Sequence, residues 1–174
     1  MSGRRSAGLL LYRKAPDGGD ETPGAAGIEV LVGHMGGPLW SRRDAGAWTI
    51  PKGEYRPDEE PLDAARREFT EELGLPVPDG PVLELGSVRQ SGGKTVTAFA
   101  LRADLDAETI TPGTFSMVWP PRSGALQEFP ELDRVAWMTP QRAAGLLVTA
   151  QRAFLDRLAA ALAGPPPPPD DRDC

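Results

Sequence analysis

One segment, Gly53 to Leu75, constrains the fold of this chain more than any other. It carries nine residues at the spacing G-x5-E-x7-R-E-U-x-E-E-x-G-U, where U is bulky and apolar: Gly53, Glu59, Arg67, Glu68, Phe69, Glu71, Glu72, Gly74 and Leu75. Pro61 suits the first turn of a helix and Gly74 the position just past its end, so this segment predicts a helix of about 13 residues. Apolar residues at steps of three and four predict one buried stripe: Leu62, Ala65, Phe69 and Leu73.

Three glutamates of this predicted helix lie on one face, because Glu68, Glu71 and Glu72 stand at i, i+3 and i+4. Closely spaced carboxylates raise one another's pKa unless a cation neutralises them. Oxygen ligands without nearby His or Cys favour Mg²⁺ or Mn²⁺ over Zn²⁺, and Mg²⁺ commonly binds together with substrate phosphates. The alternative is a solvated acidic face with ordinary ion pairs, such as Arg67 with Glu71. The two glycines, the preceding ProLysGly turn and the complete register favour the metal site.

The segment resembles the Nudix box, the signature of the Nudix hydrolase family. This resemblance implies an α/β/α sandwich with a mixed β-sheet. It also implies an enzyme in which water attacks a phosphorus of a nucleoside diphosphate linked to another group, with Mg²⁺ as cofactor and Mn²⁺ as a substitute. The metal ligands would be Glu68, Glu71, Glu72 and the backbone carbonyl of Lys52, while Arg67 would orient the glutamates.

The general base differs among members of that family, and two locations stay open here. One is Glu68, within the box. The other is a glutamate of the later loop, Glu128 or Glu131, since the family often places an acid just before the last strand. Glutamates in such a position are otherwise exposed loop residues.

The substrate must be inferred from residues outside the box. The stretch GAWTIPKGE resembles the diadenosine polyphosphate hydrolases and, less closely, the diphosphoinositol polyphosphate hydrolases. Much of the chain also resembles bacterial Nudix triphosphate pyrophosphohydrolases. Lys52 would place an ammonium beside a phosphate chain, and three further cations would extend that strip unless they are simply solvated loop residues: Arg42, Arg43 and Lys94. We expect a dinucleoside polyphosphate or a nucleoside triphosphate. A diphosphoinositol polyphosphate, or a nucleotide-sensing module without turnover, is the alternative.

The aromatic residues and the single histidine have separate interpretations. Trp40 lies in a Gly/Pro/Arg loop, where it either stacks on a base or packs locally. Trp48 and Trp137 lie in apolar strand patterns and are expected in the core. His34 ends a strand and is expected to be a partly exposed structural residue.

Composition limits the class of partner and the number of domains. The net charge of −6 argues against binding to long nucleic acid, which requires a basic face. The chain of 174 residues suits one domain over residues 1–163, and the Pro-rich acidic stretch 164–174 is expected to be a disordered tail. The only cysteine, Cys174, cannot form an intramolecular disulfide. Without an apolar run of membrane length or a signal-peptide pattern, we expect a cytoplasmic monomer or homodimer with no membrane partner.

Strands are predicted on both sides of the box helix, in seven segments: 7–13, 28–34, 48–51, 82–90, 95–102, 115–119 and 134–138. Ser91 to Lys94 should form a hairpin turn, and 16–27 a flexible excursion. Thr139 and Pro140 form an N-cap and first-turn pair that opens a helical region through Leu162, interrupted near Thr149.

Overall fold

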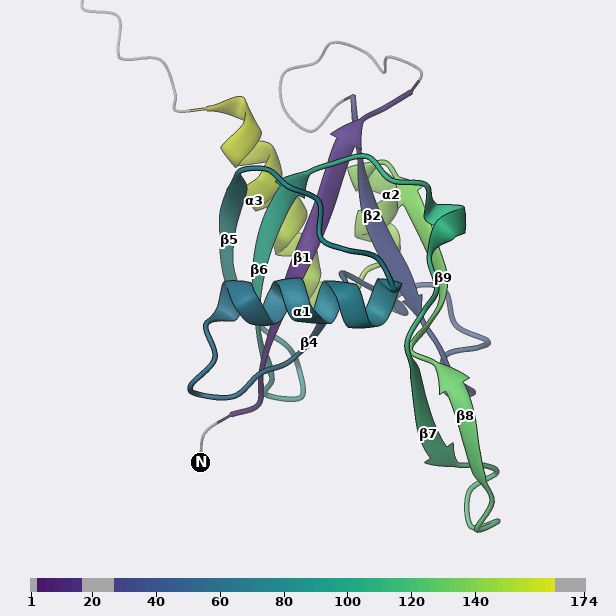
Figure 1. The fold of residues 1–174 in the computed structure, drawn as a ribbon. Coiled ribbons are helices and arrows are strands. Elements are labelled where there is room, and N and C mark those ends of the chain that lie inside the picture. Colours follow the sequence, from purple (N-terminus) through teal and green to yellow (C-terminus); the bar gives the residue numbers. More distant parts are fainter. Residues whose placement is uncertain (1–2, 17–26, 165–174) are drawn as a thin grey trace, which may run out of the picture.

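A computed structural model describes residues 3–16 and 27–164 of the chain. Seven strands form one mixed sheet: β1 (Arg5–Lys14), β2 (Ile28–Met35), β3 (Trp48–Thr49), β4 (Lys52–Glu54), β5 (Val82–Arg89), β6 (Thr95–Arg102) and β9 (Leu132–Met138). The β1–β6 pair is parallel, and the other pairs are antiparallel. Two further strands, β7 (Thr114–Val118) and β8 (Leu126–Pro130), form a separate hairpin that projects from the body (Figure 1).

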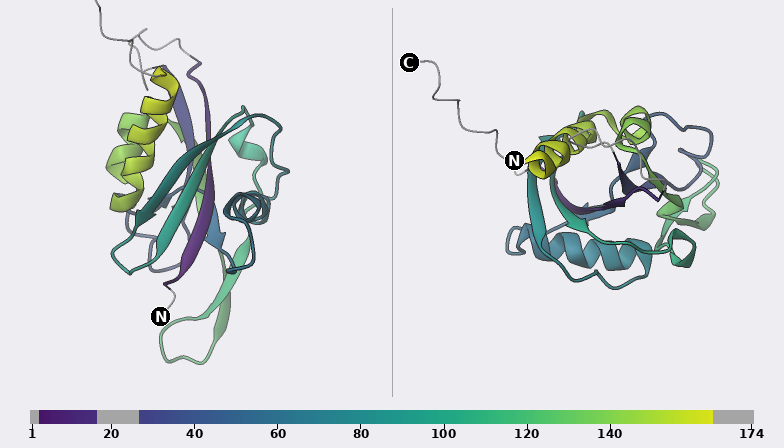
Figure 2. Two further views of the ribbon diagram at one scale, coloured as in Figure 1. Left: turned by 90° about the vertical axis from the view of Figure 1, so that its left-hand side faces the viewer. Right: turned by 90° about the horizontal axis from the view of Figure 1, so that it is seen from above.

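Helices cover both faces of the sheet. Helix α1 (Pro61–Leu73) lies on one face, and α2 (Pro140–Leu146) and α3 (Arg152–Ala163) lie on the other, as the left view of Figure 2 shows. Short 3₁₀ turns, η1 (Ala107–Thr109) and η2 (Thr149–Gln151), connect elements at the edges. The predicted α/β/α sandwich with a mixed sheet is therefore confirmed.

Strand β1 supplies side chains to both hydrophobic layers because side chains alternate along a strand. Leu9 and Leu11 pack with the α1 layer, whereas Leu10 packs with the α2 and α3 layer. All three side chains are fully buried. This alternation divides the core into two clusters and sets which face of the sheet each neighbouring side chain reaches.

The edge of β1 opposite β6 is shared by two strands. The end of β1 at Tyr12–Lys14 pairs with β2, while its beginning at Ser6–Gly8 pairs with β4. Between them, the Leu9 amide donates to the Pro51 carbonyl at 3.1 Å. The sheet therefore splits along this edge, and β4 leads from the split into the loop before α1.

Helix α1 matches its prediction. It begins at Pro61 and ends at Leu73, and the following Gly74 adopts the left-handed conformation at φ 66° and donates its amide to the Thr70 carbonyl. The fully buried stripe consists of Ala64, Ala65, Phe69 and Leu73, so the predicted stripe is right except that Leu62 is only partly buried. This burial fixes which side of the helix the glutamates face.

The remaining elements agree with expectation to different degrees. Thr139 caps α2 by accepting a hydrogen bond from the Arg142 amide, and the C-terminal helical region is interrupted before α3, as predicted. The predicted strand at 48–51 covers only two residues, as β3, while β4 begins just after the predicted range, and β8 was not predicted. The predicted excursion at 16–27 and the tail at 164–174 fall almost entirely on residues outside the described ranges. Within the described ranges, no helix is long and apolar enough to cross a bilayer.

The core prediction is confirmed for Trp48, Trp137 is only partly buried, and the histidine prediction is wrong in one respect. Trp48 is 5% exposed, and Trp137 packs against the α1 core while donating its indole N–H to the Leu105 carbonyl. His34 is fully buried rather than partly exposed. Its ring nitrogens lie 2.6 Å from a carboxylate oxygen of Asp133 and 2.7 Å from the carbonyl of Arg43. These two partners replace the water that exposure would have supplied.

Candidate active site

Strand β4 places a glycine directly against helix α1. A Cβ atom at Gly53 would overlap the carboxylate of Glu68. The position therefore needs a residue without a side chain, because the Glu68 carboxylate occupies the volume beside the backbone of β4. This contact gives a physical reason for a glycine at the first position of the box.

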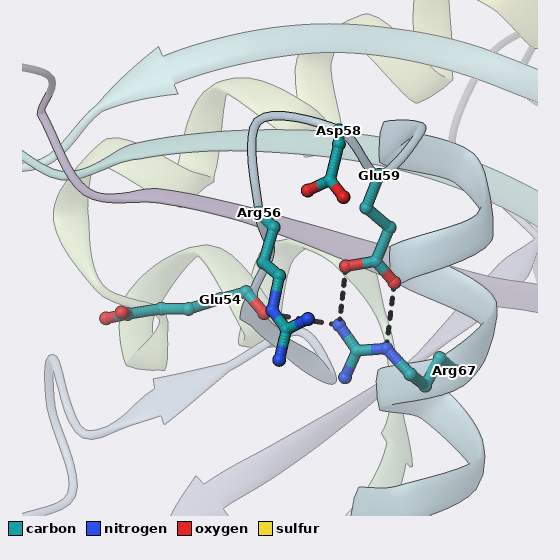
Figure 3. Close-up of a pocket in the computed structure, with 5 residues that line it drawn as sticks. All are labelled: Glu54, Arg56, Asp58, Glu59 and Arg67. Carbon is teal, nitrogen blue, oxygen red and sulfur yellow. Dashed lines mark hydrogen bonds and ion pairs between the residues drawn. The ribbon is translucent and has the colours of Figure 1, made fainter.

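Arg67 is held by a residue from the loop before the helix (Figure 3). Its Nε and Nη2 atoms donate to the two carboxylate oxygens of Glu59 at 2.8 and 3.0 Å, and Nη2 also donates to the Glu54 carbonyl at 3.2 Å. Glu59 is the main cause that raises the pKa of Arg67, and Arg67 in turn lowers the pKa of Glu59. This bidentate pair borders a hollow of about 540 Å³ that Arg56 and Asp58 also line.

The same guanidinium reaches the glutamates of the helix. Its Nη1 donates to Glu68 at 2.5 Å and to Glu71 at 3.3 Å. The expected pair with Glu71 is present but is the longest of the Arg67 contacts. No role was predicted for Glu59, because it lies before the first residue of α1 and its contact with Arg67 depends on the path of the loop between β4 and α1.

The carboxylate of Glu72 faces the backbone of β4. One of its oxygens accepts a hydrogen bond of 2.9 Å from the Lys52 amide. The pKa of Glu72 is raised to about 8, mainly by burial; Lys52 opposes this shift, and the charges of Glu131 and Glu68 contribute to it. Glu72 therefore lies in an environment that disfavours its ionised form in the absence of a cation.

Glu131 joins this group from a segment that is distant in the sequence. It lies between β8 and β9, where its amide donates to the Gly113 carbonyl at 2.8 Å. Gly113 in turn donates to the carbonyl of Glu72 at 3.3 Å, and a Cβ at Gly113 would stand 2.7 Å from the Glu71 carbonyl and 3.1 Å from a Glu131 carboxylate oxygen. The close approach of this loop to the end of α1 brings Glu131 to the box.

The alternative later glutamate does not share that position. Glu128 was expected in a loop, but it lies within β8, opposite Ser116, and is exposed. The structure therefore separates two glutamates that the sequence left as equivalent. The charges of Glu68 and Glu71 raise the pKa of Glu131.

Glu68, Glu72 and Glu131 together form what we term the carboxylate cluster. Burial is the largest cause that raises the pKa of each, and each is raised further by the charge of at least one other glutamate. All the donors are oxygens, which fits a hard cation such as Mg²⁺ or Mn²⁺. Among residues 3–16 and 27–164, no group of three His, Cys, Asp or Glu side chains lies close enough together to hold a metal ion. An incomplete set still suits Mg²⁺, which usually retains several waters.

Lys52 and Lys94 lie on the face of the sheet opposite α1. Gly8 lies opposite Lys52 in the β1–β4 pair, and a Cβ at Gly8 would meet the Cβ of Lys52 and the side chain of Ile50, which belongs to the α2 and α3 layer. Burial and then the charge of Lys94 lower the pKa of Lys52. Lys94 also pairs with Glu54, with 3.4 Å between Nζ and Oε1. The two expected phosphate-binding lysines are thus brought together.

The two loop arginines, Arg42 and Arg43, lie in different environments. Arg43 and Trp40 line a hollow of about 570 Å³ on that same face, and the Arg43 Cζ lies 5.8 Å from the centroid of the Trp40 ring. Arg42 is exposed and is not among the described residues that line this hollow. Two lining residues that the sequence did not indicate are Ser91 and Thr149, which carry no motif of their own.

Comparisons with known proteins agree with this arrangement. A family model for the NUDIX domain matches residues 22–158. The chain is 44% identical over 55 residues to an RNA pyrophosphohydrolase of Pseudomonas putida, but this match spans only 31% of the chain and 35% of that relative. The chain thus covers about a third of the length of the curated relatives it matches.

Solved structures with low sequence identity share the fold. A C. elegans Ap4A hydrolase in a binary complex has a TM-score of 0.59 at 22% identity, over 92% of this chain and 98% of that one. The NUDIX domain of Shewanella oneidensis NrtR complexed with ADP ribose has a TM-score of 0.58 at 12% identity, over 93% and 90%. Because the family model covers well over half of the sequence and the structure has the corresponding fold, the chain belongs to the Nudix hydrolase family.

Proposed function

We propose that this protein hydrolyses a phosphoanhydride bond of a nucleotide with the help of Mg²⁺, for which Mn²⁺ can substitute. The substrate is a dinucleoside polyphosphate or a nucleoside triphosphate. The carboxylate cluster carries this proposal, because three partly buried carboxylates that repel one another fit a bound cation better than a structural role.

The glutamates of α1, the backbone of Lys52 and the side chain of Arg67 have different roles in this proposal. Glu68, Glu71 and Glu72 would hold the cation, with the Lys52 carbonyl as a further ligand. When bound, the cation supplies charge neutralisation at the phosphate oxygens and lowers the pKa of the attacking water. Arg67 does not need to contact the substrate, because its bonds to Glu59 and Glu68 serve to orient the glutamate.

The general base is Glu68 or Glu131. Burial raises the pKa of both carboxylates, so each is brought nearer to the range in which a carboxylate accepts a proton effectively near neutral pH. The proposed metal ligands lie in α1 and β4, whereas Glu131 lies between β8 and β9, so it can face the attacking water from another element. The pH profiles of Glu68→Gln and Glu131→Gln distinguish the two, since only loss of the base removes the acidic limb of the profile.

Lys52 and Lys94 would bind the phosphate chain. A lysine acts as a point charge toward phosphate. An anion bound between two lysines also reduces the electrostatic repulsion between their ammonium groups. The surface available to phosphate here is this local pair rather than a broad basic face, because the chain as a whole has a net charge of −6. This favours a nucleotide over a diphosphoinositol polyphosphate.

A substrate panel tests the proposal directly. Dinucleoside polyphosphates, nucleoside triphosphates, nucleotide sugars, diphosphoinositols and an RNA oligonucleotide with a 5′-triphosphate would be incubated with Mg²⁺ or Mn²⁺ and the products separated by chromatography. ATP plus AMP from the four-phosphate dinucleotide supports the first substrate class, and pyrophosphate plus a nucleoside monophosphate supports the second. A protein that binds a nucleotide without turning over any compound of the panel would instead be a sensing module.

A further inference from the structure

We infer that the hollow beside Trp40 and Arg43 binds the aromatic base of the nucleotide whose phosphates lie at Lys52 and Lys94. This inference rests on the proposed function and adds to it the location of base recognition. The hollow has a volume of about 570 Å³, within the usual range of about 300–1,000 Å³ for small-molecule sites. It is formed by the loop after β2, the β5–β6 turn and the junction of α2 with η2.

The hollow and the two lysines lie on one face of the sheet. The side chain of Lys52 starts on the face that carries α2 and α3, and Glu54, two residues along the strand, points to the same face. Glu54 pairs with Lys94, so Lys94 is on this face as well. The α2–η2 junction packs there too, since Leu147 belongs to the same hydrophobic cluster as Ile50.

One short turn connects the two halves of this surface. Ser91 lines the hollow and Lys94 follows three residues later, in a turn closed by hydrogen bonds from the Gln90 amide to the Lys94 carbonyl and from the Gly93 amide to the Gln90 carbonyl. Three residues span at most about 10 Å of chain. A ligand that contacts both Ser91 and Lys94 therefore needs only the size of a nucleotide.

The walls of the hollow have the chemistry that a base requires. The Trp40 ring offers a stacking surface, which is favourable for any base because every base has an aromatic face. Arg43 adds a planar cation beside that ring, and the hydroxyl groups of Ser91 and Thr149 offer hydrogen bonds to polar atoms at the edge of a base. The rest of the lining is small or apolar: Ala45, Gly46, Val148 and Ala150.

Hydrogen bonds from buried residues of β2 and β3 hold the loop that carries Trp40 and Arg43. The buried ring of His34 contacts the Arg43 carbonyl at 2.7 Å, and the indole N–H of Trp48 donates to Asp44 at 2.8 Å. These bonds hold the loop in place before any ligand arrives. A preformed wall reduces the entropy lost on binding, which suits a recognition site.

Two matched ligands test this inference: adenosine 5′-methylenediphosphonate and methylenediphosphonate, which share a non-hydrolysable diphosphate but differ in the nucleoside. Calorimetry with Mg²⁺ would compare the wild type with Trp40→Ala and Ala45→Trp. The first variant removes the stacking surface, and the second fills the hollow from an exposed rim position without disturbing the core. Trp119→Ala is the control, because Trp119 lies at the end of the projecting hairpin and does not line the hollow.

Both variants should weaken binding of the nucleoside diphosphonate by roughly tenfold and leave methylenediphosphonate binding unchanged. Trp119→Ala should change neither. Equal weakening of both ligands, or no weakening of either, would overturn the inference while leaving the proposed function intact. If the wild type bound neither ligand with Mg²⁺, the proposed function itself would fail, and the base site with it.

Discussion

The Lys52 amide donates a hydrogen bond of 2.9 Å to the carboxylate of Glu72, which lies one strand and most of a helix further along the chain. This bond connects the first residue of β4 to the last glutamate of α1. It also brings the backbone of Lys52, the proposed metal ligand, next to the most strongly perturbed carboxylate of the site. The geometry of catalysis should therefore depend on Glu72 more than on its exposed neighbours.

Replacement of Glu72 by Gln should leave the protein folded and lower kcat by about a hundredfold or more, because a metal-held electrostatic contribution is lost. The measurement is steady-state hydrolysis with Mg²⁺, together with a melting curve. Glu60→Gln is the matched control, since Glu60 is exposed and its side chain makes no capping bond. A near-normal rate for Glu72→Gln would refute the assignment.

Cation binding should depend on pH, because the folded protein holds a proton on Glu72 below pH about 8 that the cation must displace. The apparent Mg²⁺ affinity should rise by roughly ten- to a hundredfold between pH 6 and pH 8 and level off above that. Calorimetry in buffers of different ionisation enthalpy measures both the affinity and the released proton. An affinity independent of pH in this window would contradict the prediction.

The raised pKa of Glu72 should make the metal-free protein less stable as pH rises, whereas it makes Mg²⁺ binding stronger. Between the ordinary pKa of 4.5 and the folded value of about 8, the folded state holds a proton that the unfolded state has released. The free energy of unfolding should therefore fall as pH rises through this window. Mg²⁺ should raise Tm more at pH 8.5 than at pH 6, and Glu72→Gln should remove that difference.

Gly53→Ala should lower kcat by about tenfold or more and lower Tm, because the new Cβ would overlap the Glu68 carboxylate and displace it. Gly92→Ala is the control, since a Cβ at Gly92 meets nothing within 4 Å. Both variants would be compared by thermal melting and by steady-state kinetics. Equal behaviour of the two would show that the close approach of β4 to α1 has no functional consequence.

Arg67→Lys should reduce kcat with little change in KM, because a lysine cannot reproduce the two parallel bonds to Glu59 while also holding Glu68. An arginine that acted on the substrate directly would raise KM as well. Arg66→Lys, at the exposed neighbouring position, is the control. The split between kcat and KM distinguishes the orienting role from a binding role.

Much of this site was predictable because it depends on local periodicity. The start of the helix at Pro61 and its end just before Gly74 follow from backbone preferences, and the shared face of the three glutamates follows from their spacing. The pairing of Arg67 with Glu71 is of the same kind. These features need no knowledge of what lies beyond the helix.

The features that were missed depend on contacts between distant segments. Glu131 and Glu128 look alike in sequence, and only the hydrogen bonds of Gly113 bring one of them to α1. Strand β8 was overlooked because its exposed residues lack the alternation of a half-buried strand. The burial of His34 could not be foreseen, since its partner Asp133 lies 99 residues away.

The most direct test of the account is a crystal of the protein soaked with Mn²⁺ and adenosine 5′-methylenediphosphonate, examined at the manganese absorption edge. The account predicts an anomalous peak at the carboxylate cluster, in contact with oxygens of Glu68 and Glu72 and of the ligand phosphates. A map without a peak there, with the nucleotide bound elsewhere or not at all, would contradict it.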